Sequence, residues 1–158
     1  MTAEEKLSSL NLSLPAPPSP GGNYLPFRRS GCLVILAGVI SVSDEAGEWI
    51  GQVGDERSIE DGTEAARVCA LNALAALRSV TGSLDDVKQI LYMGGYVNAI
   101  AGYGQSPSVI NGASDLFVEI FGDAGKHARA AVSVAGLPRN ATVEIQVTAE
   151  MKEPAAEA

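Results

Sequence analysis

The sequence predicts an α+β domain in which one β-sheet carries two helices on one face. Two segments, 58–82 and 106–122, have apolar residues at helical spacing, and five others have the length and composition of strands. Their order is ββαβαββ, as expected for a sheet layer packed against a helix layer. A chain of 158 residues is long enough for one such domain and too short for two.

The first 22 residues are expected to lie outside this domain, as an N-terminal extension and linker. Residues 2–10 are predicted to form one short helix, with Thr2 as the N-cap and Glu5 completing a capping box. Residues 15–22 are predicted to be an extended linker, because prolines and glycines fill most of this segment.

The α+β domain is expected to cover residues 23–151, followed by a flexible tail at 152–158. The N-terminal segment is acidic and has no long apolar core, so it lacks the pattern of a secretory signal. No later segment reaches the roughly 18 apolar residues of a membrane span. We therefore expect a cytoplasmic protein with no membrane partner.

The domain is predicted to begin with a hairpin and a loop. Residues 24–29 and 32–38 have the composition of two short strands joined at Ser30-Gly31, and the second contains an uninterrupted apolar run. Residues 39–57 contain several glycines and acidic side chains, which favours a loop.

Both helices of the domain have start and stop signals. Ser58 opens the first helix, with Asp61 in the third position of an S-x-x-D start, and Gly82 ends it. Ser106-Pro107 is predicted to begin the second, since serine suits the cap and proline the first helical position. Gly122 closes this second helix.

Three further strands are predicted to complete the sheet. Residues 87–99 form a long strand that we expect to be broken or bulged at Gly94-Gly95. Residues 128–136 and 142–150 follow as two strands joined by a turn.

Alternation along the last two strands predicts which side chains share a face. The polar positions are expected on the face that carries no helix: Arg129, Ser133, Glu144 and Gln146. A mixed face of small and polar side chains suits a subunit interface better than open solvent. Oligomerisation is therefore expected, and symmetry would repeat any site at each interface.

The charge balance makes nucleic acid an unlikely partner. The formal net charge is −8, and the 11 lysines and arginines are spread along the chain, with Arg28-Arg29 as the closest pair. Nonspecific nucleic-acid binding needs clustered basic residues to displace counterions from phosphates. An acidic surface favours small-molecule or protein partners instead.

The cysteines and the single histidine do not form a recognisable metal or catalytic group. Cys32 and Cys69 lie in apolar segments and are interpreted as buried, reduced thiols. No structural zinc site can be assembled from these residues, and no spacing supports a Ser-His-Asp triad. His127 is interpreted as a helix-end or loop residue whose charge complements the preceding helix.

Several residues near both ends of the domain follow the pattern of one known family. An arginine opens the penultimate strand, a Leu-Pro turn follows, and the last strand has the form Val-Glu-Ile: Arg129, Leu137-Pro138 and 143–145. Further matches are Tyr24, Gly31, Gly38 and Ile110-Asn111. Over roughly residues 20–150 the sequence resembles the RidA/YjgF family, also called the L-PSP endoribonuclease family.

The resemblance implies a fold like that of a bacterial chorismate mutase and a homotrimer with clefts between subunits. It also implies hydrolysis of reactive enamine or imine acids, such as 2-aminoacrylate, to a 2-keto acid and ammonia, without a metal or cofactor. Arg129 would hold the substrate carboxylate bidentately. Glu144 would activate water or carry a proton to the departing amine. Tyr24, Asn111 and the backbone around Gly38 would complete the substrate site.

The sequence departs from the family pattern at four positions. Ala131 stands where a cysteine is common, Ala37 and Val39 replace two polar residues, and His127 replaces a proline. The changes at positions 37, 39 and 131 motivate an alternative function, a binding module that holds a small carboxylate metabolite without chemistry. The endoribonuclease activity attached to the family's name is a third hypothesis, which the net charge of −8 disfavours.

Each candidate residue also has a structural interpretation. Arg129 can pair with an acidic residue of a neighbouring subunit, and Glu144 can be its salt-bridge partner. Tyr24 can simply pack, and Asn111 can cap or bridge the backbone. Ser133 is interpreted as a filler of the sheet.

Overall fold

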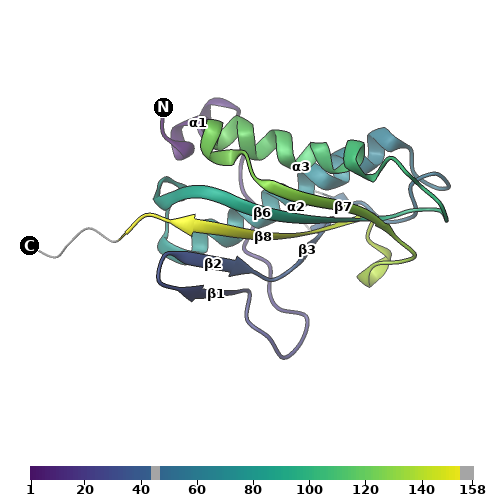
Figure 1. Cartoon of the computed structure of the whole chain (residues 1–158), viewed down its shortest axis with the longest axis horizontal. Coiled ribbons are helices and arrows are strands. Elements are labelled where there is room, and N and C mark those ends of the chain that lie inside the picture. The colour runs from purple at the N-terminus through teal and green to yellow at the C-terminus, as the bar shows by residue number, and fades with distance from the viewer. Residues whose placement is uncertain (44–46, 154–158) are drawn as a thin grey trace, which may run out of the picture.

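The computed structural model describes residues 1–43 and 47–153, where one six-stranded sheet carries three helices (Figure 1). The helices are α1 Ala3–Ser9, α2 Ile59–Thr81 and α3 Ser106–Phe121, with 3-10 turns η1 Leu84–Asp86, η2 Gly122–Gly125 and η3 Pro138–Asn140. The strands are β1 Phe27–Ser30, β2 Leu33–Leu36, β3 Val39–Ile40, β4 Val42–Ser43, β5 Gly47–Glu48, β6 Val87–Asn98, β7 Ala128–Val134 and β8 Val143–Met151.

The long strands β6 and β8 form the centre of the sheet, and β7 lies at one edge. The order is β1-β2-β8-β6-β7, with β3 continuing beside β8, and β4 pairs with β5 in a separate small ribbon. Only β6 and β7 are parallel, because α3 carries the chain back across the sheet between them. The predicted ββαβαββ order is confirmed, although residues 39–57 contain short strands as well as loop.

The ends of α2 follow the predicted signals. The Ser58 side chain accepts from the Asp61 backbone N–H in a capping box, and Gly82 ends the helix with φ 97°. At Gly112 of α3, a Cβ would lie 2.1 Å from the Thr63 backbone oxygen of α2. The two helices therefore approach closely where this glycine leaves room. None of the helices in the described residues is long and apolar enough to span a membrane.

The bulge expected at Gly94-Gly95 is wrong. Both glycines pair in regular register with β8, and the irregularities lie earlier, between Val87 and Gln89 and between Ile90 and Tyr92. The glycines instead leave space for neighbouring side chains that pack against the strand. A Cβ at Gly95 would lie 2.7 Å from the Ile110 side chain of α3, and one at Gly94 would lie 3.0 Å from a tyrosine hydroxyl.

The predicted cap of α3 is also wrong. Gln105 occupies the N-cap position without a side-chain hydrogen bond, and Ser106 is the first residue of the helix. The Ser106 hydroxyl is bonded to Ser133, which in turn donates to the Tyr103 carbonyl at 2.8 Å. Ser133 is therefore more than a filler, because it ties β7 to the start of α3.

The N-terminal helix α1 is packed onto the domain. Its predicted capping box between Thr2 and Glu5 is present, and Leu7 is buried in the core. Glu4 makes two hydrogen bonds to Arg78 near the end of α2 and accepts from the Leu84 backbone N–H at 2.9 Å. Leu12 and Leu14 pack against the core as the chain leaves α1.

The prediction that Arg129 and Ser133 lie on the helix-free face with Glu144 and Gln146 is wrong. Arg129 pairs with Met93, whose side chain is fully buried beneath the helices, so Arg129 faces the helix layer. Glu144 pairs with Tyr96, which is exposed on the opposite face. Because β7 is an edge strand, its helix-side positions stay half-exposed and can be polar.

Candidate functional site

The predicted site residues fall into two groups, because Arg129 and Glu144 lie on opposite faces of the sheet. Arg129 and Asn111 lie at the β7 edge on the helix side, whereas Glu144, Gly38 and Tyr24 lie elsewhere. We call the first group the arginine half-site and the second the glutamate half-site.

In the arginine half-site, α3 supplies every hydrogen-bond partner of the guanidinium. Nη1 of Arg129 donates to the Asn111 Oδ1 at 2.8 Å and to the Ser114 Oγ at 3.1 Å, and Nη2 donates to the Pro107 carbonyl at 3.3 Å. Within residues 1–43 and 47–153, Arg129 forms no salt bridge. Asn111 thus orients the arginine, and no ion pair with the described residues holds it.

The arginine keeps two donors for a ligand. A guanidinium has five N–H groups, and the three contacts to α3 use three of them. The Nε–H and one Nη2–H have no partner among the described residues. Two such donors on one planar group can hold a carboxylate bidentately.

Ser114 and His127 extend the arginine half-site. The Ser114 Oγ lies 3.0 Å from the His127 Nε2, and the His127 Nδ1 lies 2.7 Å from the Gly125 carbonyl oxygen. Ser114 was missed in the sequence, although it follows Asn111 by one helical turn and so shares its face. His127 does sit next to the turn after α3, as expected, but its ring contacts Ser114.

Glu144 is a half-buried carboxylate without a hydrogen-bond or ion-pair partner among the described residues. It lies between Ile40 of β3 and Tyr96 of β6, and no described residue donates a hydrogen bond to it. Burial raises the pKa of the Glu144 carboxyl above its ordinary value. Because Arg129 lies on the other face, a salt bridge between these two residues within one chain is excluded.

Gly38 brings the rest of the glutamate half-site together. A Cβ at Gly38 would lie 2.2 Å from a Glu144 carboxylate oxygen, so the carboxylate rests directly over this glycine. Gly38 and Tyr24 line one small pocket, together with Pro18 and Pro26. The Tyr24 hydroxyl accepts from the Gly21 backbone N–H at 2.9 Å, which folds the linker onto its own tyrosine.

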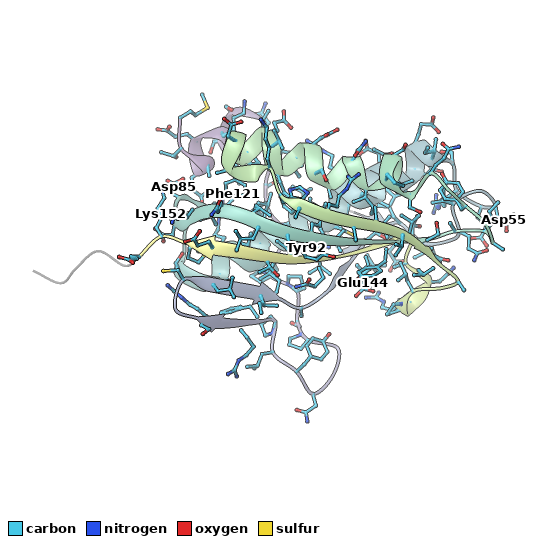
Figure 2. All side chains as sticks on the ribbon, in the orientation of Figure 1. Asp55, Asp85, Tyr92, Phe121, Glu144 and Lys152 are labelled. Atoms are coloured by element: carbon cyan, nitrogen blue, oxygen red, sulfur yellow. The ribbon has the colours of Figure 1, made fainter. Side chains whose placement is uncertain are left out.

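The helix-free face around Glu144 carries several exposed apolar side chains. Its large side chains have relative exposures of 37–47%: Leu33, Ile35, Tyr92, Tyr96 and Val132. Figure 2 shows Glu144 and Tyr92 along the middle of the sheet. Between the apolar groups of β2 and β6, the central strand β8 presents polar side chains, among them Glu144, Gln146 and Thr148. A mixed face of this kind is typical of a subunit interface.

A second pocket contains none of the predicted site residues. It is bordered by α1, η1 and the end of α3, and Asp85, Phe121 and Lys152 are part of its lining (Figure 2). The Lys152 Nζ already donates to the Asp85 carbonyl at 2.6 Å. Because no half-site residue lines it, this pocket is distinct from both half-sites.

Comparison with known proteins decides the family. Residues 4–151 match the model of the family described as "YjgF/chorismate mutase-like, putative endoribonuclease". The chain belongs to the RidA/YjgF family. The curated protein TCP17 of Trypanosoma cruzi is 36% identical over 146 residues, which cover 92% of this chain and 91% of TCP17.

Solved structures of the RidA/YjgF family share this fold. A "putative endoribonuclease" from Shewanella oneidensis is 32% identical with a TM-score of 0.91, covering 96% of this chain and 100% of that one. RidA from the Antarctic bacterium Psychrobacter is 25% identical with a TM-score of 0.59, covering 86% of this chain and 94% of that one. The mixed α+β fold predicted from the sequence is thus confirmed.

Proposed function

We propose that this protein hydrolyses reactive enamine or imine acids, such as 2-aminoacrylate, to a 2-keto acid and ammonia, in clefts between the subunits of a homotrimer. One observation carries the proposal. On one face of the sheet, Arg129 presents two donors that have no partner among the described residues, and on the other face Glu144 presents a carboxylate that likewise has none there. These complementary groups can meet only between two copies of the chain.

The exposed apolar side chains on the helix-free face support such an assembly. Burying Leu33, Ile35 and Tyr92 against a neighbouring subunit would remove their surface from water, which favours association. Val132 of β7 is exposed on the same helix-free face, so the proposed contact can include the edge strand. A head-to-tail contact between different surfaces forms a ring when its rotation closes, and a ring of three copies would have three equivalent sites.

Within each cleft, the residues have distinct tasks. The two remaining donors of Arg129 bind the substrate carboxylate, while Gly38 and Tyr24 line the pocket beside Glu144. The raised pKa of the Glu144 carboxyl makes its ionised form a better base toward water. The imine carbon is itself electrophilic, so the chemistry requires no metal or organic cofactor.

The proposed reaction starts from the imine, and an enamine such as 2-aminoacrylate first tautomerises to it by moving a proton from nitrogen to carbon 3. Two further proton transfers follow. The water oxygen bonds to the imine carbon while Glu144 accepts a water proton and passes it to the nitrogen. This step gives a carbinolamine, in which the carbon carries both a hydroxyl and an amino group. Glu144 then moves the hydroxyl proton to the nitrogen, the carbon–nitrogen bond breaks, and ammonia leaves as the keto group forms.

The test is the rate of imine decay. An amino-acid oxidase generates imino acids in situ, semicarbazide traps what remains, and wild type is compared with Arg129→Ala. We expect wild type alone to accelerate the loss of imine. A matched control is Arg67→Ala, which removes a partly exposed arginine that forms one ion pair with Glu119 on the helix layer.

The small, apolar residues beside the half-sites favour one other function. Ala37 and Val39 flank Gly38, and Ala131 follows Arg129 on the same face of β7, so few polar groups surround a bound ligand. If wild type binds pyruvate in an Arg129-dependent manner but accelerates no imine hydrolysis, the protein is a carboxylate-binding module and the proposed reaction is wrong.

A further inference from the structure

His127 and Ser114 form a hydrogen-bonded chain behind the arginine that the proposed reaction does not itself use. The chain runs from the Arg129 guanidinium through the Ser114 hydroxyl and the His127 ring to the Gly125 backbone. Its direction can be worked out from donors and acceptors alone.

The direction of hydrogen donation along this chain follows from the Gly125 carbonyl at its end. A carbonyl oxygen can only accept, so the His127 Nδ1, 2.7 Å from the Gly125 oxygen, carries the hydrogen. In a neutral ring the Nε2 is then an acceptor, and the Ser114 hydroxyl donates a hydrogen bond to it at 3.0 Å. The Ser114 oxygen is left with its lone pairs toward Arg129, whose Nη1 donates to it at 3.1 Å.

The histidine itself is held in place by packing. Its ring meets the Phe117 ring edge-on, with centroids 5.9 Å apart and planes at 84°. A Cβ at Gly125 would lie 2.2 Å from the Phe117 carbonyl oxygen, so the η2 turn that carries the acceptor is pressed against the end of α3. The far end of the chain is therefore anchored in the fold.

We infer that His127 is a positioning residue, which acts through Ser114 to fix the orientation of the Arg129 guanidinium toward a substrate carboxylate. This inference rests on the proposed function. With Nη1 occupied by Asn111 and Ser114, the guanidinium cannot rotate within its plane, and its two remaining donors point in a constant direction. The loss of this order weakens carboxylate binding in ground and transition states alike.

The kinetic test uses a double-mutant cycle. Ser114→Ala and His127→Ala are each expected to raise KM for the imino acid about tenfold, as for one lost hydrogen bond to a charged group, with kcat within about twofold of wild type. Because His127 acts only through Ser114, the double variant is expected to be no worse than Ser114→Ala alone. His127→Gln, which keeps an acceptor toward Ser114, is expected to restore most of the loss.

Three results would overturn the inference: an unchanged KM in His127→Ala, additive effects in the double variant, or no rescue by glutamine. The matched control is Ser108→Ala, which removes an exposed hydroxyl from the same helix, and it should keep the wild-type KM. A role of His127 in stability alone would lower kcat and the amount of folded enzyme without this pattern.

The tautomer of His127 gives a test that does not depend on turnover. The ¹⁵N NMR signals of the ring in the wild-type protein are expected to show a protonated Nδ1 and a bare Nε2. A protonated Nε2 would overturn the inference while the proposed function stood. If wild type neither hydrolyses imines nor binds pyruvate, the proposed function fails, and the tautomer still decides the direction of the chain.

Discussion

Co-expression of two inactive variants, Arg129→Ala and Glu144→Gln, tests whether one site takes residues from two subunits. In a mixed trimer, a subunit with an intact Arg129 can face a subunit with an intact Glu144. A mixed trimer holds two copies of one variant and one copy of the other, and only one of its three subunit junctions joins an intact Arg129 to an intact Glu144. Doubly tagged trimers should therefore recover about one third of the wild-type rate. Unselected one-to-one mixtures should recover about one quarter.

The assay is imine decay on trimers purified through two different affinity tags, one on each variant. Each variant expressed alone sets the background, and the two purified homotrimers mixed without subunit exchange give the control. Recovery near one third would agree with a shared site. Activity that stays at the background level in proven mixed trimers would refute the reasoning, because both residues would then have to act within one subunit.

Three further predictions concern the glutamate half-site and the core. Gly38→Ala should lower kcat about 100-fold, because its Cβ would lie 2.2 Å from the Glu144 carboxylate oxygen and displace it; steady-state kinetics would show this. Glu144→Gln should raise the melting temperature at pH 8 but not at pH 4. Burial raises the pKa of Glu144 in the folded state above its value in the unfolded chain. The protonated carboxyl therefore makes its full contribution to protein stability below the unfolded-state pKa, and this contribution is lost as the pH rises through the folded-state pKa. Gly112→Ala should lower the free energy of unfolding by about 1–3 kcal/mol in urea denaturation, since its Cβ meets the Thr63 backbone oxygen at 2.1 Å.

Each of these predictions has an outcome that contradicts it. Wild-type kcat in Gly38→Ala would mean that the Glu144 carboxylate is free to move aside. If Glu144→Gln also raises the melting temperature at pH 4, the stabilisation comes from better packing of the glutamine and not from removal of an ionised carboxylate. For Gly112→Ala, the comparison is Gly104→Ala, where a Cβ meets no atom within 4 Å and little change is expected.

Local signals predicted the helices well, because the decisive contacts lie within a few residues of each other. Ser58 and Asp61 bond across one turn, and Gly82 adopts its left-handed conformation at the helix end. The family motif pointed to Arg129 and Glu144, whose roles stay a prediction. The inferences that failed were the Ser106 cap and those that depended on a neighbouring element.

The face of Arg129 is the clearest example. Alternation fixes which residues of a strand share a face, but it does not say which face meets the helices. Polarity suggested the helix-free side, whereas register with β6 places Arg129 beside the buried Met93. The bulge predicted at Gly94 and Gly95 was wrong for a similar reason. These glycines leave space for side chains that come from other parts of the fold, which the local sequence does not reveal.

The docking of α1 has a consequence for the linker that follows it. Glu4 fastens the start of the chain to the end of α2, and β1 fastens the chain again at Phe27. Figure 1 shows the segment between them descending from α1 to the loop beside β1. Tyr24 therefore belongs to a loop tethered at both ends, which samples far fewer positions than a trailing tail. An N-terminal truncation would free one tether and loosen the wall of the Gly38 pocket from the far side of the molecule.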